Sequence, residues 1–394
     1  MGVWDLLLSI AALPLTVATT YLAMLALFSR KGSQTQPVKA ARTRFDVIVP
    51  AHDEASGIAR TVRNLRSLDY PANRFRVIVV ADNCTDDTAK LAQEAGAIVW
   101  ERSSANRGKG FALSFAYQRS AEERFADAVV VIDADTEASP NLLRAFDRRI
   151  SSGAKAIQAY DGVLNARANW RTQLLSLGFA LVHAVRSSAR ETMSLSAGLH
   201  GNGMCFTHAL IKSHPHDAFS IVEDLEYGVR LAKAGIRVEY AAECSVLAEM
   251  PTGEKASRSQ RQRWEQGRRA LAKAHGWPLL REGLTRKNGL LVDTGLDLLI
   301  PPLSTLVLAA IAGLVLSLAF TREGLAVWLY ALNVTSLFFY VLRGWHLSGL
   351  GARGLLALAY APVYVVWKVL LRFRPAPRKG EWVRTARASS VESA

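Results

Sequence analysis

The feature that most constrains this chain is a nearly unbroken apolar segment from Leu6 to Phe28. A helix rises about 1.5 Å per residue, so a helix over this segment is long enough to cross a hydrocarbon core of about 30 Å. Asp5 is the only charged side chain ahead of it, and the basic residues follow it. Because a cleaved signal peptide carries its basic residues in front, we expect a retained membrane anchor over residues 1–30, with the chain after it in the cytoplasm.

Two more apolar runs lie near the other end, from Leu303 to Phe320 and from Leu325 to Leu342, and a short polar turn joins them. They predict a transmembrane hairpin over residues 303–347. The segment before it, 278–302, mixes leucines with charged residues. We expect it to form amphipathic, interfacial helices that line an acceptor entrance.

The last apolar run, residues 352–373, contains Pro362 and Lys368 and is followed by a basic tail over 374–394. A full crossing here would place that tail outside the cell. An interfacial or re-entrant helix, which leaves the tail in the cytoplasm, is therefore favoured over the alternative of a third C-terminal transmembrane helix.

Composition narrows the function. Half of the residues are apolar and 21% are charged, which excludes a disordered chain. The 48 Lys and Arg against 34 Asp and Glu give a net charge of +14, which suits phosphate-bearing ligands or anionic lipids. The basic excess lies mostly at the membrane flanks, without a recognised nucleic-acid module, so no nucleic-acid partner is expected. The cysteines Cys84, Cys205 and Cys244 are odd in number and widely spaced, as in a reducing compartment.

Between residues 44 and 277, short β-branched runs alternate with helical stretches, which predicts an α/β domain with a mainly parallel central sheet. The strand candidates are Phe45 to Pro50, Phe75 to Asp82, Ala97 to Trp100 and Ala128 to Asp133. Three of them end in polar residues that include Glu54, Asp82 and Asp133. One such carboxylate is readily explained as a helix cap, but three at neighbouring strand ends favour a ligand site, since open α/β sheets bind ligands there.

The pair Asp133 and Asp135 is the strongest metal candidate. In an extended chain, residues two apart point to the same side, so both carboxylates can bind one Mg²⁺ or Mn²⁺, which also contacts substrate phosphates. Lys109 lies in a glycine-containing loop before a predicted helix, which is typical of an anion site, although the spacing is not that of a Walker A loop.

Two further motifs carry charge. Glu223 and Asp224 begin a predicted helix, where carboxylates are favoured even without a function. The basic run from Ser259 to Arg269 includes Arg263 and Trp264, a combination that suits a diphosphate and a sugar ring. The alternative for this run is a solvated or membrane-facing charged helix.

Taken in order, these motifs resemble the membrane-integrated family 2 glycosyltransferases of the GT-A fold, the branch that includes cellulose, chitin and hyaluronan synthases and ceramide glucosyltransferase. The similarity runs from about Phe45 to Arg269. The opening Ile48–Glu54 is similar to the family's nucleotide-binding start, with His52 and Asp53 in place of the usual Tyr and Asn. Val222-Glu223-Asp224 resembles its T-E-D motif with Val for Thr, and residues 260–264 resemble its Q-[QR]-x-R-W motif.

The resemblance implies a GT-A (Rossmann-like) domain and an inverting, metal-dependent hexosyltransferase. Its donor would be a nucleotide diphosphate sugar, by family habit a UDP-sugar, and its acceptor a membrane-associated lipid or growing glycan. The implied site residues are Asp133 and Asp135 for the Mg²⁺ or Mn²⁺ ion; Glu54, Asp82, Lys109, Asp133 and Arg263 for the nucleotide sugar; Gly201, Asn202, Gln260 and Trp264 for the acceptor; and Glu223 and Asp224 for catalysis, with Asp224 as the general base.

Three alternatives stay open. A processive polysaccharide synthase would carry the same motifs, but the few predicted spans favour a lipid-linked acceptor, or export through a partner or an oligomer. An inactive membrane protein that senses nucleotide sugars is opposed by the complete set of carboxylates. A polyprenyl-phosphate glycosyltransferase typically lacks the Q-x-x-R-W motif. We expect an integral protein of a bacterial inner membrane, with membrane lipids around its helices.

Overall fold

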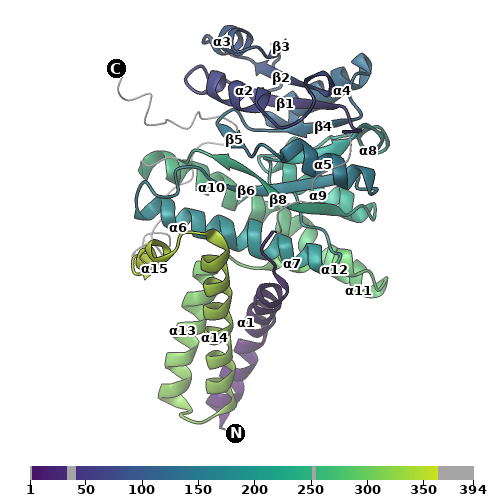
Figure 1. Ribbon diagram of the computed structural model, residues 1–394. Coiled ribbons are helices and arrows are strands. Elements are labelled where there is room, and N and C mark those ends of the chain that lie inside the picture. Colours follow the sequence, from purple (N-terminus) through teal and green to yellow (C-terminus); the bar gives the residue numbers. More distant parts are fainter. Residues whose placement is uncertain (1, 33–40, 251–253, 363–394) are drawn as a thin grey trace.

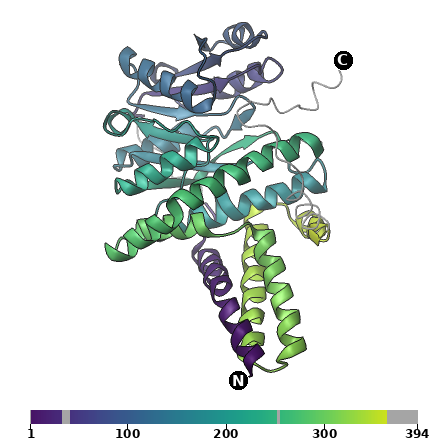
Figure 2. The same ribbon diagram turned by 180° about the vertical axis from the view of Figure 1, so that it is seen from behind.

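The computed structural model of the 394-residue chain describes residues 2–32, 41–250 and 254–362, with side chains from residue 262 onward in the last range. An α/β domain stands on a bundle of three long helices, and a layer of shorter helices lies between the two (Figures 1 and 2). The N-terminus lies at the far end of the bundle, away from the α/β domain (Figure 1).

The α/β domain is built on an eight-stranded sheet of order β3-β2-β1-β4-β7-β6-β8-β5. The strands are β1 (Phe45–Ala51), β2 (Phe75–Asp82), β3 (Ile98–Arg102), β4 (Ala128–Val131), β5 (Thr136–Ala138), β6 (Ala156–Val163), β7 (Met204–Thr207) and β8 (Val238–Ala248). The first four strands are parallel, as predicted. The sheet becomes mixed beyond them, because β7 runs antiparallel to both β4 and β6.

Helices cover both faces of the sheet. Their bounds are α2 (Ile58–Arg66), η1 (Ala72–Arg74), α3 (Thr88–Glu94), α4 (Lys109–Glu123), α5 (Leu142–Ser151), α8 (His208–Ser213) and α9 (Glu223–Lys233). The fully buried β1 shows why two layers form. Val47 and Val49 face a core shared with α2, α3 and α5, while Ile48 faces a core shared with α4, α8 and α9. Alternate residues of an extended strand point to opposite sides, so one apolar strand supplies both cores.

The layer between the domain and the bundle contains most of the remaining helices. They are α6 (Trp170–Phe179), the π-helical η2 (Ala180–Arg186), α7 (Ser187–Thr192), α10 (Glu254–Leu271), the π-helical η3 (Ala272–Gly276), α11 (Trp277–Thr285) and α12 (Gly289–Leu299). The charged residues of this layer were expected at a membrane interface. Asp293 and Asp297 of α12 instead form ion pairs inside the protein with Arg190 of α7.

The bundle consists of α1 (Val3–Phe28), α13 (Leu303–Phe320) and α14 (Leu325–Ser348), each long and apolar enough to cross a membrane. The segments predicted as the anchor and the hairpin are therefore helical, and the second arm of the hairpin ends at Ser348, one residue beyond the predicted range of 303–347. Polar contacts join the first and last helix: Thr19 donates to Asn333 Oδ1 at 2.8 Å, and the Ala326 backbone N–H donates to the Asp5 carboxylate at 2.9 Å.

After the hairpin, the short helix α15 (Ala352–Leu358) lies beside α6, level with the junction layer (Figure 1). Trp170 of α6 and Tyr360 stack with ring centroids 5.3 Å apart. The second half of the predicted 352–373 helix and the whole basic tail over 374–394 lie outside the described residues. The choice between a surface helix and a third C-terminal span therefore stays a prediction, as do the other domain limits.

Candidate active site

Lys109 and Asp133 form the centre of the site, at the carboxyl end of the parallel strands. Asp133 follows β4, and Lys109 opens α4. The Lys109 ammonium contacts the Asp133 carboxylate and donates to the Gly201 carbonyl oxygen at 2.7 Å. Burial alone would lower the pKa of Lys109, but Asp133, Glu223 and Asp224 outweigh it and raise that pKa above its ordinary value. Lys109 is thus a fixed cation among carboxylates.

Glu223 and Asp224, the predicted catalytic pair, begin α9 and lie close to the same centre. A β-carbon on Gly201 would lie 3.4 Å from Asp224 Oδ2 and 3.7 Å from Lys109 Nζ. Gly201 has a φ of +82°, a left-handed conformation that favours glycine. Burial raises the pKa of both carboxyl groups, further for Glu223 than for Asp224. The predicted base and the predicted acceptor loop are therefore neighbours.

Asn202 has a different role from the one expected. Its side-chain oxygen accepts from the Asp133 backbone N–H at 3.1 Å, and its side-chain nitrogen donates to Thr136 at 3.0 Å and to Asp161 at 3.3 Å. Asn202 is buried, with all these partners inside the protein. The side chain holds the Asp133 turn in place and does not point to an acceptor.

Asp161 on β6 is a site residue that the sequence analysis missed. It is buried, and burial together with the neighbouring Asp133 raises its pKa well above the ordinary range. His183 lies against it, with its Nδ1 2.9 Å from the Asp161 backbone oxygen. Nothing in the local pattern marks Asp161, because it comes near Asp133 only through the pairing of distant strands.

Helix α10, which carries the Q-x-x-R-W segment, packs against the start of α9 through Gly267. A β-carbon on Gly267 would lie only 2.6 Å from a Val222 methyl group, so the α10 backbone at Gly267 packs directly on the Val222 side chain. Trp264 is 40% exposed, and its ring lies 6.2 Å from that of Phe179. Arg263 carries a buried Nε for which the described residues supply no hydrogen-bond partner, and burial lowers the pKa of its guanidinium. The Gln260 side chain lies outside the described residues.

Two of the predicted nucleotide-binding residues, Asp82 and Glu54, make hydrogen bonds within the protein. The Asp82 carboxylate accepts from Arg102 Nη1 at 2.5 Å and is 2% exposed. His52 Nδ1 lies 2.7 Å from the Asp82 backbone oxygen, so the ring that replaces the usual Tyr lies at the end of β2. Glu54 donates its backbone N–H to Thr88 at 2.8 Å. Arg102 therefore pairs with Asp82, the aspartate that the resemblance assigns to the nucleotide sugar.

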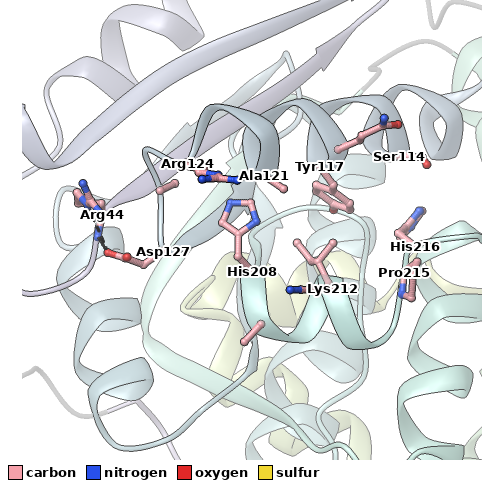
Figure 3. A pocket seen from close by; sticks show the side chains of 14 residues that line it. Arg44, Ser114, Tyr117, Ala121, Arg124, Asp127, His208, Lys212, Pro215 and His216 are labelled. Carbon is pink, nitrogen blue, oxygen red and sulfur yellow. Dashed lines mark hydrogen bonds and ion pairs between the residues drawn. The ribbon is translucent and has the colours of Figure 1, made fainter.

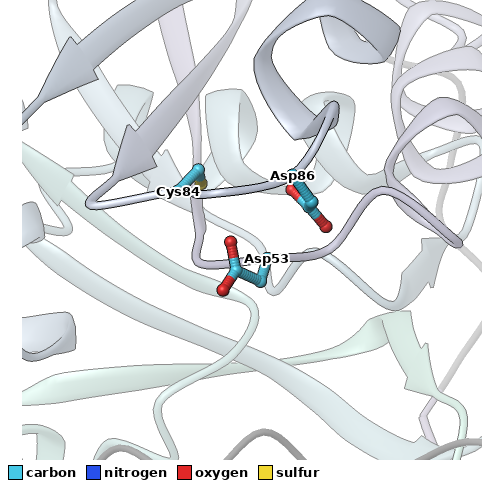
Figure 4. A group of neighbouring side chains, drawn as sticks. All are labelled: Asp53, Cys84 and Asp86. Atoms are coloured by element: carbon cyan, nitrogen blue, oxygen red, sulfur yellow. The ribbon is translucent and has the colours of Figure 1, made fainter.

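A second acidic group, Asp53, Cys84 and Asp86, lies in the neighbouring loops (Figure 4), with ligand atoms within 4.8 Å of one another. Its carboxylates already have partners: Asp53 accepts from the Thr85 backbone N–H at 2.7 Å, and Asp86 from that of Ala55 at 3.1 Å. Burial raises the pKa of the Cys84 thiol, which disfavours the thiolate that binds metals. This group fastens two loops together.

The carboxylates that fit a hard cation are Asp133 and Asp135. Oxygen ligands suit Mg²⁺ and Mn²⁺, and Mg²⁺ is usually held by one or two carboxylates completed by substrate phosphates. The Lys109 ammonium on Asp133 shows that this position accepts positive charge. The donor set therefore fits the divalent ion expected from the sequence.

A cavity of about 590 Å³ lies elsewhere, between α4 and α8, with Tyr117, His208 and His216 in its lining (Figure 3). Arg44 and Asp127, on its rim, directly precede β1 and β4. The cavity is thus at the amino ends of the strands, the edge opposite Asp133, and is not the donor site.

Comparison with known proteins identifies the family and the fold. Residues 42–267 match the family model described as "Glycosyltransferase like family 2". A mannosyltransferase, PcManGT from Pyrobaculum calidifontis, solved in complex with GDP-Man and Mn²⁺, superposes with a TM-score of 0.55 at 20% identity. The match covers 86% of this chain and 96% of that one. At this identity the likeness shows the GT-A fold alone.

Curated relatives include two enzymes of lipid glycosylation. A 4,4'-diaponeurosporenoate glycosyltransferase of Staphylococcus haemolyticus is 27% identical over 50% of this chain and 52% of its own. A beta-monoglucosyldiacylglycerol synthase of Nostoc sp. is 27% identical over 66% of this chain and 56% of its own. The probable glycosyltransferase YdaM of Bacillus subtilis is 23% identical over 57% and 55%. The chain spans about half the length of the curated relatives it matches.

Proposed function

Because the chain belongs to glycosyltransferase family 2, we propose that it transfers a hexose from a nucleotide diphosphate sugar, of the UDP type, to a lipid acceptor at the cytoplasmic face of a bacterial inner membrane. The observation that carries this proposal is the contact of Lys109 with Asp133 and the Gly201 carbonyl, beside the Asp224 carboxylate: a β-carbon on Gly201 would lie 3.4 Å from Asp224 Oδ2. Donor-side charge and a candidate base thereby meet at one point.

At the donor side, Asp133 and Asp135 would hold Mg²⁺ or Mn²⁺, which supplies neutralising charge for the departing diphosphate. Lys109 contributes a buried positive charge beside the same carboxylate. Arg263 has a buried Nε without a protein partner among the described residues, so a phosphate oxygen is the acceptor that would satisfy it.

At the acceptor side, Asp224 removes the proton of the attacking hydroxyl. That oxygen forms a bond to the anomeric carbon from the face opposite the diphosphate, and the bond to the diphosphate breaks, so one displacement inverts the configuration. The raised pKa suits this role, since a base works best with a pKa closer to the operating pH. Glycine at position 201 leaves the space beside Asp224 open for the hydroxyl.

A lipid acceptor is supported by two features. Trp264 presents a partly exposed indole, on which the C–H face of a sugar or an apolar chain can pack, and its neighbour Phe179 ends α6. Helix α6 packs against membrane helix α14. The Nostoc relative is named as a synthase of beta-monoglucosyldiacylglycerol, and the Staphylococcus relative as a glycosyltransferase of 4,4'-diaponeurosporenoate. The three-helix bundle would then hold the site at the bilayer.

The test is to incubate the full chain in lipid nanodiscs with a panel of nucleotide sugars, with Mg²⁺ or Mn²⁺ or with chelator, and with bacterial lipid extract as acceptor. We expect metal-dependent nucleotide release with one donor and transfer of one labelled sugar into the lipid fraction. Asp224→Asn should abolish transfer, while Glu226→Gln, a matched change on the same helix at a residue paired with Arg230, should not. Label in long water-soluble polymer would favour a processive synthase. Nucleotide-sugar binding without turnover would favour a sensor.

A further inference from the structure

A buried cluster of charges lies in the layer of helices between the α/β domain and the three-helix bundle, on the membrane side of the site. Arg186 and Arg190 are one helical turn apart, and so are Asp293 and Asp297 on the facing helix α12. Arg190 Nε lies 2.9 Å from Asp293 Oδ2, and its Nη2 lies 2.7 Å from Asp297 Oδ1. Arg186 Nη1 lies 3.0 Å from the same Asp297 oxygen. The arginines and Asp293 are less than a tenth exposed.

Two tyrosines from the membrane helices complete this cluster. Tyr21 of α1 donates its hydroxyl to Asp293 Oδ1 at 2.6 Å and accepts from Arg190 at 2.8 Å. Tyr340 of α14 accepts from Arg186 Nε at 2.9 Å and donates to the Leu181 backbone oxygen at 2.8 Å. Both rings are buried. The first and last helices of the bundle are therefore bonded directly to the layer above them.

The opposite side of the cluster reaches α10. Arg268 Nη2 contacts the Asp297 backbone oxygen and lies 3.3 Å from its Oδ2. Burial alone would raise the pKa of Asp297, but Arg190, Arg268 and Arg186 hold it well below its ordinary value. Arg268 is one helical turn from Trp264 and next to Gly267, the residue that touches Val222. Asp297 is thus the point at which α10 is joined to the bundle.

We propose that this cluster positions the acceptor side of the active site. Arg268 binds Asp297, and Asp297 is linked through Arg190 to Tyr21. These contacts fix helix α10, which carries Trp264, over the Glu223 and Asp224 pair. The membrane helices are then part of the transfer machinery and not only an anchor. This inference rests on the proposed function, since it assigns the acceptor to the α10 side.

The donor side of the site is held in place by other contacts. Lys109 and the Asp133 turn are held by Gly201 and Asn202, and the side-chain hydrogen bonds of Asn202 in the described part of the chain go to Asp133, Thr136 and Asp161, outside the charge cluster. Loosening the cluster should therefore separate two activities that a general loss of folding would lower together: hydrolysis of the donor by water and transfer to the lipid acceptor.

The experiment compares the full chain in nanodiscs with Arg268→Ala and Arg268→Lys variants, measuring nucleotide release without acceptor and the KM for the lipid acceptor. We expect Arg268→Ala to raise the acceptor KM by about tenfold or more while hydrolysis stays within about twofold, and Lys to restore part of the loss. Arg286→Ala, which removes a largely exposed arginine paired with Glu282, is the matched control. Transfer and hydrolysis falling in parallel, or an unchanged acceptor KM, would overturn the proposal.

The membrane arm has its own pair of variants. Tyr21→Phe removes one hydroxyl from α1 and keeps the ring, so it should raise the acceptor KM in the same direction; Tyr330→Phe, on α14 outside the cluster, should not. Amide hydrogen exchange over residues 262–271 gives a second readout that needs no turnover. Faster exchange in Arg268→Ala and Tyr21→Phe supports the proposal, and unchanged exchange overturns it. A wild-type chain that is inactive with every donor would count against the proposed function alone.

Discussion

Replacing Gly267 by alanine tests how tightly α10 must pack against the start of α9, the helix that begins with Glu223 and Asp224. The added β-carbon would meet a Val222 methyl group at 2.6 Å, about 0.8 Å inside the ordinary contact distance of 3.4 Å. Val222 is buried and branched at its β-carbon, so the helix must move instead. Overpacking of this kind destabilises by about 1–3 kcal/mol. A displacement near 1 Å at a reacting centre lowers rates by up to about 10²-fold.

We expect Gly267→Ala to lower the thermal midpoint by about 2–4 °C for each kcal/mol lost and to reduce transfer by about 10- to 100-fold. Gly178→Ala is the matched control, because a β-carbon on this helical glycine meets nothing within 4 Å, and alanine there should be neutral or stabilising. The double variant Val222→Ala with Gly267→Ala should recover much of the loss, since it removes the methyl groups in the way. A single variant with wild-type stability and transfer, or a double variant no better than the single, would refute this reasoning.

Three further outcomes are expected. As the pH is lowered, the transfer rate should begin to drop above the ordinary carboxyl pKa of about 4, because the base must be ionised and burial raises the pKa of Asp224. A pH-rate profile checks this, and a midpoint of the drop at or below about pH 4 would contradict it. Chelator should abolish transfer and Mn²⁺ restore it, whereas Asp135→Asn should need much more Mn²⁺; equal metal titrations for variant and wild type would contradict the assignment. Arg76→Ala should destabilise by about 3–5 kcal/mol because it removes the cation from the fully buried Asp46 and leaves that carboxylate with a hydrogen bond from Ser120 but no compensating charge. Arg144→Ala breaks an equally short but exposed pair and should change stability by about 0–1 kcal/mol; denaturant titration distinguishes the two variants.

Local patterns predicted the first half of the fold because each of its strands is an apolar run with a polar end. Residues 75–82 form β2 over the predicted range, and the predicted strand that begins at Phe45 forms β1. The antiparallel β7 escaped prediction, since its direction is set by pairing with β4 and β6 and not by its own four residues. A period-two pattern is the same for a strand of either direction.

The site residues, like the strands, fall into those that a local motif predicts and those that only contacts between distant segments reveal. Lys109, Asp133 and Asp224 were predicted from their motifs, and the fold brings them together around Gly201. Asp161 and the Arg102 partner of Asp82 were missed, because a charged side chain in a sequence carries no sign of which distant charge it will meet. Asn202 was assigned to the acceptor for its place in a glycine-rich loop, yet its amide holds the Asp133 turn. A motif locates a residue in the site without saying which way its side chain points.

The hydrogen bond from Ala326 to Asp5 joins residues 321 positions apart in the chain. During synthesis α1 must therefore wait for this partner while the entire α/β domain is made and the hairpin follows. Only when the start of α14 emerges can the acid cap that helix, whose free N–H groups attract a negative charge. Closure of the bundle is consequently a late event in biogenesis, and a chain that stalls before the hairpin would present an incompletely assembled membrane helix to quality control.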